Sequence, residues 1–246
     1  MARYDFNAQR LFVEADLAEG ATIPCSSGQA NYLKNVLRLK AGNEILVFNG
    51  RDGEWRASLA EGSKRSALLD IGERVRPHED GPDIDYLFAP LKRARLDYMV
   101  QKATEMGVAR LRPVLTHRTV AERVNIERMR ANVIEAAEQC GILRIPTVAG
   151  PEKLESLIAG WEARRPLVFC DEASEEHCPF TTLARLQPGP LALLIGPEGG
   201  FDDGERALLA SKPFVTRISL GPRILRADTA AVAALALVNA VLGDWR

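Results

Sequence analysis

A glycine-rich segment at residues 191–205 is the first place where the chain could bind a ligand. An apolar run leads into Gly196-Pro197-Glu198-Gly199-Gly200, and glycines permit positive φ and let a ligand approach the backbone closely. The segment has neither the lysine of a Walker motif nor the spacing of a dinucleotide-binding fingerprint. On local physics alone, a tight strand-to-helix turn capped by Asp202 or Asp203 is the favoured interpretation.

A second segment, residues 218–238, combines arginines with large apolar side chains in a short loop. Arg223 and Arg226 lie between an expected strand and an alanine-rich stretch that Asp228-Thr229 opens. The large apolar side chains of this loop are Leu220, Ile224 and Leu225. A helix N-cap at Asp228 or Thr229 explains the stretch but not the loop. An apolar loop with few polar groups, beside a glycine-rich turn, suits a flat ligand such as adenine.

A third segment, residues 135–146, shows an amphipathic helical pattern that Gly141 ends. Arg144 follows it and could be an ordinary solvated loop charge. Cys140 has no neighbouring base in the sequence, so we expect it to be buried rather than nucleophilic.

Alternating strands and helices position these segments from residue 84 onward. The expected strands cover 84–91, 109–116, 166–173, 190–197 and 215–221, and the expected helices cover 96–106, 127–140, 203–211 and 229–242. Continuous apolar strands in such alternation predict a parallel α/β sheet covered on both faces. Ligands of such sheets bind beyond the strand ends, where these segments lie.

The first 72 residues follow a different rhythm, typical of a small β-barrel. Short strands are expected at 11–17, 44–50, 54–62 and 66–75, with a break at 20–24 and one helix at 27–37 capped by Ser26 or Ser27. A segment rich in Pro, Gly and acidic residues covers 76–83. We therefore expect two domains, 1–72 and 84–246, joined by a linker at 73–83.

Composition excludes several classes of protein. The 246 residues carry 32 basic and 33 acidic side chains, for a net charge of −1, which argues against bulk attraction to nucleic acid. Residues 86–130 nevertheless hold ten basic and four acidic side chains, so a local basic face is expected. Four scattered cysteines without a CxxC pair predict no metal site and reduced thiols. A charged N-terminus and the lack of a long apolar run predict a cytoplasmic protein.

Four motifs, in their order and spacing, resemble those of one known family. They are GPEGG at 196–200, LGPRILRADTA at 220–230, EAAEQCG at 135–141 with a following Arg-x-Pro, and QKATEMGV at 101–108. They are similar to motifs of the bacterial 16S ribosomal RNA uracil-N3 methyltransferases, which belong to the SPOUT class of S-adenosylmethionine-dependent enzymes. Residues 36–50 resemble the PUA-like N-terminal barrel of that family, so the resemblance covers essentially the whole chain.

The resemblance implies a C-terminal domain with a deep trefoil knot that holds S-adenosylmethionine. By position, the cofactor-binding residues are Gly196, Glu198, Gly199, Gly200, Leu220, Gly221, Ile224 and Leu225. Uracil N3 must lose its proton to accept a methyl group, and a cation can stabilise the charge that spreads onto O2 and O4. Arg226 is expected in that role. Asp228 is a weaker candidate for the proton acceptor, because a carboxylate at a helix start is usually ionised.

The implied partner is 16S rRNA of the small ribosomal subunit, at the uridine conventionally numbered 1498. The target base must be unstacked to expose N3, which favours a structured loop. The candidate RNA-binding residues are Lys34, Arg38, Lys92, Arg93, Lys102, Arg118, Arg123 and Arg144. The resemblance also implies a homodimer, for which the alanine-rich C-terminal helix could supply the surface.

Two positions depart from the family pattern. Asp228 stands where similar enzymes usually have Glu, and Ile142 stands where they often have Arg. Two alternatives stay open: a SPOUT enzyme that methylates a ribose 2′-hydroxyl or another base, and a non-catalytic RNA-binding assembly factor. The intact glycine-rich loops argue against the second.

Overall fold

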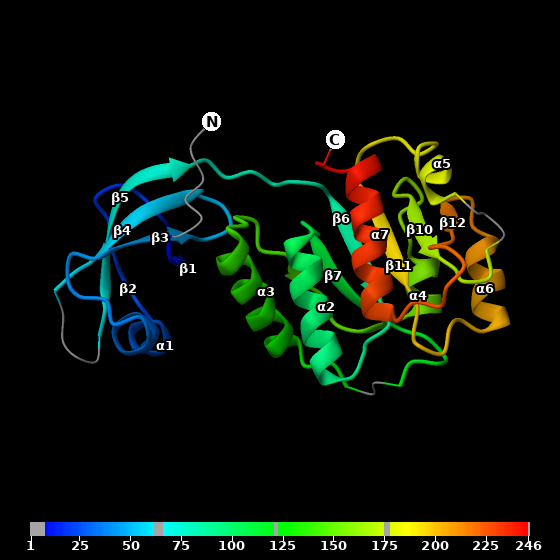
Figure 1. Cartoon of the computed structure of the whole chain (residues 1–246), viewed down its shortest axis with the longest axis horizontal. Coiled ribbons are helices and arrows are strands. Elements are labelled where there is room, and N and C mark those ends of the chain that lie inside the picture. The colour runs from blue at the N-terminus through cyan, green and yellow to red at the C-terminus, as the bar shows by residue number, and fades with distance from the viewer. Residues whose placement is uncertain (1–7, 62–65, 121–122, 175–177, 246) are drawn as a thin grey trace. The chain divides into compact units, whose positions relative to one another are not determined.

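The computed structural model describes residues 8–61, 66–120, 123–174 and 178–245 (Figure 1). The chain forms two compact units, one made of residues 1–80 with 137–145 and the other of residues 81–136 with 146–246. Among the described residues, no helix is long and apolar enough to cross a membrane.

The first unit is built on a five-stranded sheet with the strand order β1-β3-β4-β5-β2. Its strands are β1 (Arg10–Phe12), β2 (Thr22–Pro24), β3 (Glu44–Phe48), β4 (Glu54–Leu59) and β5 (Leu68–Arg76). β1 runs parallel to β3, and the other pairs are antiparallel. The break expected at residues 20–24 is wrong in part, because Thr22–Pro24 pairs with β5. The expected first strand is also shorter than its apolar pattern suggested.

One helical segment packs against this sheet. It starts as α1 (Ser27–Asn31) and continues as a π-helical turn, η1 (Tyr32–Val36). Ser26 caps it through a capping box with Gln29, which confirms the predicted N-terminus. Ala30 and Leu33 turn into the apolar core of the sheet.

A buried charged cluster joins the distant segment 137–145 to this unit. The Glu54 carboxylate is 2% exposed and accepts from Arg10 Nε at 2.9 Å and from Arg76 Nε at 2.8 Å. Arg76 in turn donates to the Gly141 carbonyl at 2.8 Å. Two cations therefore compensate one buried carboxylate, as a buried charge requires. Phe48 packs with Ala137 and Leu143 beside this cluster.

The second unit contains a wholly parallel sheet, as predicted, with the order β12-β10-β11-β6-β7-β8 and a short β9 on β7. Its strands are β6 (Ile84–Phe88), β7 (Arg110–Leu115), β8 (Thr147–Val148), β9 (Glu152–Lys153), β10 (Leu167–Cys170), β11 (Leu191–Ile195) and β12 (Val215–Ile218). β6 and β11 are buried along their whole length.

Helices cover both faces of this sheet. They are α2 (Arg93–Glu105), α3 (Ile126–Cys140), α4 (Leu154–Ala159), α5 (Pro179–Leu183), α6 (Asp203–Ala210) and α7 (Ala227–Val241). One face packs against α4 and α6 in a cluster that includes Leu87, Phe169 and Leu194. On the other, the Tyr86 hydroxyl lies 3.0 Å from Met99 Sδ of α2, and α7 lies beside α2 (Figure 1). The sequence did not predict α4, α5, β8 or β9.

Strands β10, β11 and β12 are neighbours and run in the same direction. The loops that leave their carboxyl ends therefore meet at one edge of the sheet, which is where open α/β sheets bind ligands.

Candidate functional site

A cavity of about 260 Å³ lies among the loops that follow β10, β11 and β12. All eight predicted cofactor-binding residues line it, namely Gly196, Glu198, Gly199, Gly200, Leu220, Gly221, Ile224 and Leu225. The two loops are thus brought together although some 20 residues separate them in the sequence. Ile224 is 98% exposed, so one large apolar side chain of the cavity wall stands almost wholly in solvent.

Two glycines are needed for the shape of the turn after β11. At Gly196, an added Cβ would lie 2.3 Å from a ring carbon of Phe201, and Phe201 is 1% exposed. Gly200 has φ +67°, a conformation that costs a side-chain-bearing residue about 1–2 kcal/mol. The expected N-cap is confirmed: Asp202 accepts from the Glu205 N–H and Glu205 accepts from the Asp202 N–H. The close packing of the turn therefore depends on residue size as well as on φ.

Acidic residues after β10 form a part of the cavity wall that sequence reasoning missed. Asp171 is 1% exposed, and its Oδ2 accepts from Arg217 Nη2 at 2.6 Å. Glu172 is paired with Arg206, which also lies 3.5 Å from Asp171 Oδ1. Burial raises the pKa of the neighbouring Cys170 thiol well above its usual range, and the Asp171 charge adds to the shift. Cys170 is therefore a neutral thiol near pH 7 and not a nucleophile.

The loop after β7 contacts the glycine-rich turn through a side-chain hydrogen bond. Arg118 Nη1 donates to the Gly199 carbonyl at 2.8 Å. The adjacent His117 is paired with Asp202 through Nδ1 and lies 3.2 Å from Glu155 Oε1 through Nε2. Its backbone N–H donates to Glu205 Oε1 at 2.9 Å. Residues 117 and 118 thus hold both the turn and the start of α6.

The pKa of the His117 imidazole is expected to lie above 6.5, the ordinary value for histidine. The hydrogen bond and the charge of Asp202 raise its pKa, with smaller contributions from Glu205 and Glu155. A raised pKa in the folded state adds stability that is complete below pH 6.5 and is lost as pH rises through the folded value. An NMR titration of the ring protons measures this directly. The Asp202→Asn variant keeps a good N-cap residue but loses the charge, so the midpoint should fall. A midpoint that does not move in D202N would contradict the assignment.

One group of side chains in the described part of the chain has metal-ligand geometry. Ligand atoms of His117, Glu155 and Glu205 lie within 4.8 Å of one another. The Glu205 oxygens already accept from the His117 and Asp202 backbone N–H groups. Hydrogen bonds from backbone N–H groups therefore account for the position of Glu205 without a metal.

The two predicted catalytic residues flank the cavity without lining it. Arg226 lies between the lining residues Leu225 and Ala227, and Asp228 follows them. The predicted N-cap at Asp228 or Thr229 is wrong, because α7 begins at Ala227 with Arg226 at the cap position. The exposed Arg226 side chain makes no capping bond. Asp228 Oδ1 accepts from the Thr229 N–H at 2.9 Å.

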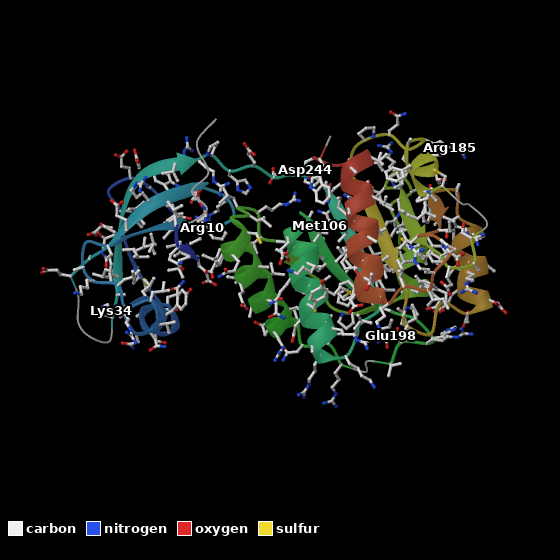
Figure 2. The ribbon with its side chains drawn as sticks, in the orientation of Figure 1. Arg10, Lys34, Met106, Arg185, Glu198 and Asp244 are labelled. Atoms are coloured by element: carbon white, nitrogen blue, oxygen red, sulfur yellow. The ribbon has the colours of Figure 1, made fainter. Side chains whose placement is uncertain are left out.

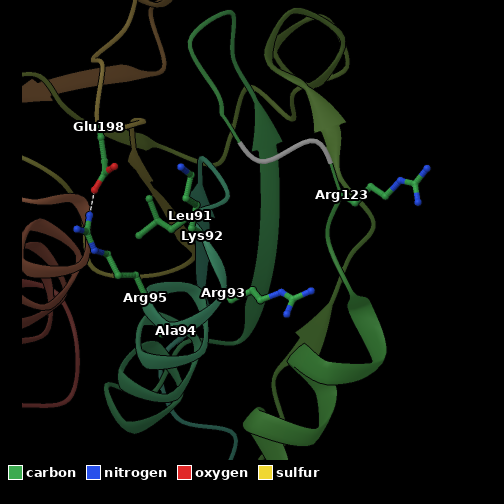
Figure 3. A pocket seen from close by; sticks show the side chains of 7 residues that line it. All are labelled: Leu91, Lys92, Arg93, Ala94, Arg95, Arg123 and Glu198. Atoms are coloured by element: carbon green, nitrogen blue, oxygen red, sulfur yellow. Dashed lines mark ion pairs between the residues drawn. The ribbon is translucent and has the colours of Figure 1, made fainter.

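The predicted basic face is narrower than the sequence suggested. Four of its arginines are engaged in ion pairs with Asp83, Asp85, Asp97 or Glu127, namely Arg110, Arg112, Arg128 and Arg130. Lys102, a candidate RNA-binding residue, lies 2.6 Å from Glu105. Of the other five cations, Arg118 donates to the Gly199 carbonyl. The remaining four, Lys92, Arg93, Arg95 and Arg123, line a second cavity of about 690 Å³ with Leu91, Ala94 and Glu198 (Figure 3).

The other RNA-binding candidates lie in the first unit. Lys34 Nζ donates to the Ser66 carbonyl, and Arg38 is exposed with an unusual positive φ of 56°. Arg144 is half-buried in the segment that follows α3. Cys140 is exposed, so the expectation that it is buried is wrong.

Comparison with known proteins adds independent information. Residues 79–239 match the family described as RNA methyltransferase domain, and residues 27–72 match the RNA methyltransferase PUA domain. The chain is 31% identical to ribosomal RNA small subunit methyltransferase E of Rickettsia conorii, over 94% of both chains. It is 34% identical to the protein of the same name from Synechocystis, over 96% of this chain and 78% of that one.

Solved structures agree with this match. A Legionella pneumophila protein described as a methyltransferase, in complex with S-adenosylmethionine, superposes with a TM-score of 0.85 at 28% identity, over 97% and 99% of the two chains. The Neisseria gonorrhoeae ribosomal RNA small subunit methyltransferase E superposes with a TM-score of 0.86 at 24% identity, over 98% and 100% of the chains. At 24% identity, the Neisseria structure shows that this chain has the same fold.

Proposed function

Because the chain belongs to the family of ribosomal RNA small subunit methyltransferases E, we propose that it transfers a methyl group from S-adenosylmethionine to N3 of U1498 in 16S rRNA. The observation that carries this proposal is the single cavity lined by both motif loops. The Legionella relative is described in complex with the same cofactor, which supports the choice of methyl donor.

The residues of the cavity fit such a cofactor. Leu220, Ile224 and Leu225 supply apolar side chains that suit a flat purine, and the glycine-rich turn offers backbone groups at close range. Asp171, Glu172 and Glu198 bring carboxylates to a ligand that carries positive charge. When bound, S-adenosylmethionine would supply an activated methyl group on its sulfonium.

The chain's own residues would then have two tasks at the uracil. They must orient N3 toward the methyl carbon at roughly 3–3.5 Å, and they must favour loss of the N3 proton. The Arg226 guanidinium would stabilise the negative charge that spreads onto O2 and O4. Asp228 would be the weaker partner for the proton, since its Oδ1 already accepts from the Thr229 N–H.

Finer features of the fold belong to the same proposal. Domains 1–72 and 84–246 with a linker at 73–83, closure of the five-stranded sheet into a PUA-like barrel, and a trefoil knot in the C-terminal domain would follow from family membership. RNA would be bound by basic residues of both domains, and cations that no described carboxylate neutralises, such as Lys92 and Arg93, are the strongest candidates.

A homodimer is proposed as the working form. An apolar groove lies on α7, lined by Pro179, Phe180, Leu220, Gly221, Ala233, Ala236, Leu237, Ala240 and Trp245. Phe180 and Trp245 are 53% and 56% exposed, and exposed apolar patches of this kind commonly mark interfaces. Two of the lining residues also line the cofactor cavity, so a second copy seated here would complete the surroundings of the site.

The variant Ala240→Glu is expected to dissociate this dimer. Ala240 is exposed on α7, so glutamate there would fit the single chain but place a charge in the interface. Light scattering should give twice 27.0 kDa for the wild type and 27.0 kDa for A240E. Ala131→Glu, at an exposed alanine of α3, is the matched control and should stay dimeric. A monomeric wild type, or an A240E dimer of undiminished strength, would contradict the proposal.

Mass spectrometry of digested 16S rRNA, incubated with and without the protein and S-adenosylmethionine, tests the activity. The expected product is 3-methyluridine at position 1498. A 2′-O-methylnucleoside or another methylated base would instead place the chain among related enzymes of the class. No modification together with no cofactor binding in calorimetry would indicate a non-catalytic RNA-binding factor.

A further inference from the structure

Glu198 occupies a position between two cavities of the second unit. Its side chain lines the cavity proposed for the cofactor and also the basic cavity at the start of α2 (Figure 3). A movement of this carboxylate would therefore change the charge and the lining of both cavities. The basic cavity is the larger of the two, at about 690 Å³ against 260 Å³.

The Glu198 carboxylate is ion-paired with Arg95 of α2. The two side chains are 51% and 39% exposed, and an ion pair this accessible to water is weak. Within the described residues, the other cations of the basic cavity make no ion pair; they are Lys92, Arg93 and Arg123. The cavity thus holds four cations and one carboxylate, so an anion is attracted to it.

An RNA phosphate is the anion that best fits this arrangement. Like a carboxylate, it can accept two parallel hydrogen bonds from a guanidinium, so it can compete with Glu198 for Arg95. It also brings negative charge to a cavity that Lys92, Arg93 and Arg123 line. A phosphate that accepts from Nη1 of Arg95 competes with Glu198 for that atom.

We propose that an RNA phosphate displaces the Glu198 carboxylate from Arg95 and that the released carboxylate turns toward the cofactor cavity. The inference rests on the proposed function, since it requires RNA and a cationic cofactor as ligands of one chain. Coupling between two sites is reciprocal. RNA should therefore raise the affinity for S-adenosylmethionine, which carries a positively charged sulfonium. It should raise the affinity for S-adenosylhomocysteine less, because the sulfur of that molecule is uncharged.

The first test measures RNA affinity without cofactor. The probe is a fluorescent RNA oligonucleotide with the 16S sequence around position 1498. Glu198→Gln should bind it about 3- to 10-fold more tightly than the wild type, because Arg95 no longer needs to be released. Arg95→Gln should bind more weakly and should lower the slope of log K against log salt by about 0.7–0.9. In the R95Q background, E198Q should bring little or no gain.

Glu44→Gln is the matched control for the change in net charge. Glu44 is ion-paired with Arg56 at 3.1 Å in the first unit, and the two side chains are 55% and 44% exposed. E44Q should leave RNA affinity unchanged. An equal gain in E44Q, an equal gain of E198Q in the R95Q background, or no gain in either E198Q or Glu198→Ala would overturn the proposal.

The second test measures cofactor affinity by calorimetry with and without the oligonucleotide. The wild type should bind S-adenosylmethionine more tightly when RNA is present, and R95Q should lose this coupling. Failure of the proposed exchange at Arg95 can be told apart from failure of the proposed function. Formation of 3-methyluridine without an E198Q effect rejects the exchange alone, whereas an E198Q effect without methylation rejects the activity alone.

Discussion

Replacing Arg226 with alanine is expected to lower the rate of methyl transfer by roughly 10²–10³-fold, or about 2.7–4 kcal/mol, with little change in the affinity for S-adenosylmethionine. The backbone of Arg226 holds the cap position of α7, between two residues that line the cavity, while its exposed side chain makes no capping bond. The guanidinium is therefore available to a ligand. Its removal would leave the developing charge on O2 and O4 of uracil without a cation.

Single-turnover kinetics with saturating cofactor separate this effect from binding. Arg226→Lys keeps the charge but not the planar fork, so part of the rate should return. Arg185→Ala is the control for loss of an exposed arginine in the same unit, and Figure 2 shows Arg185 well away from Glu198. R185A should turn over like the wild type. Full activity in R226A would remove Arg226 from the mechanism.

The parallel sheet and its longer helices could be predicted from the sequence because their signals are local. The apolar runs of β6 and β11 are buried along their length, and this burial is what continuous hydrophobicity indicates. α3 ends at Cys140 as Gly141 predicts, and α6 begins after the capping box at Asp202. Capping side chains and positive-φ glycines act on their immediate neighbours, so they can be read without the fold.

Elements that depend on distant partners could not be predicted in this way. Thr22–Pro24 is a strand because β5 pairs with it, although glycine and proline around it indicate a break. Segment 137–145 joins the first unit through the Arg76–Gly141 bond and the packing of Leu143 on Phe48. No local pattern of residues 137–145 contains that information.

The candidate site shows the same division. Residue types singled out its glycine-rich turn and apolar loop, the family resemblance implied that they bind the cofactor, and they line one cavity. Asp171 and Glu172 were missed, although their place directly after β10 was a usable signal, since neighbouring parallel strands end at the same edge. The size of the basic face expected at 86–130 was overestimated. Arg110 and Arg112 pair with Asp85, which is 3% exposed, so their charges are not free to attract RNA.

Gly196→Ala is expected to destabilise the second unit by about 1–3 kcal/mol and to weaken cofactor binding at least tenfold. The new Cβ would meet the Phe201 ring at 2.3 Å. That ring is held edge-on against Phe169 with a centroid separation of 4.9 Å, and both residues are in the buried core. Overpacking of a rigid site costs energy in this range. The backbone of the turn would have to move instead, and the turn forms one wall of the cavity.

Thermal unfolding and calorimetry with S-adenosylmethionine measure the two effects separately. Gly150→Ala is the matched control, because a Cβ there meets no atom within 4 Å; it should leave both quantities unchanged. Phe201→Leu in the G196A background removes part of the ring that the methyl group meets, so it should restore some cofactor affinity even though it costs core packing. If G196A bound the cofactor as the wild type does, the close contact between the turn and Phe201 would not be what shapes the cavity.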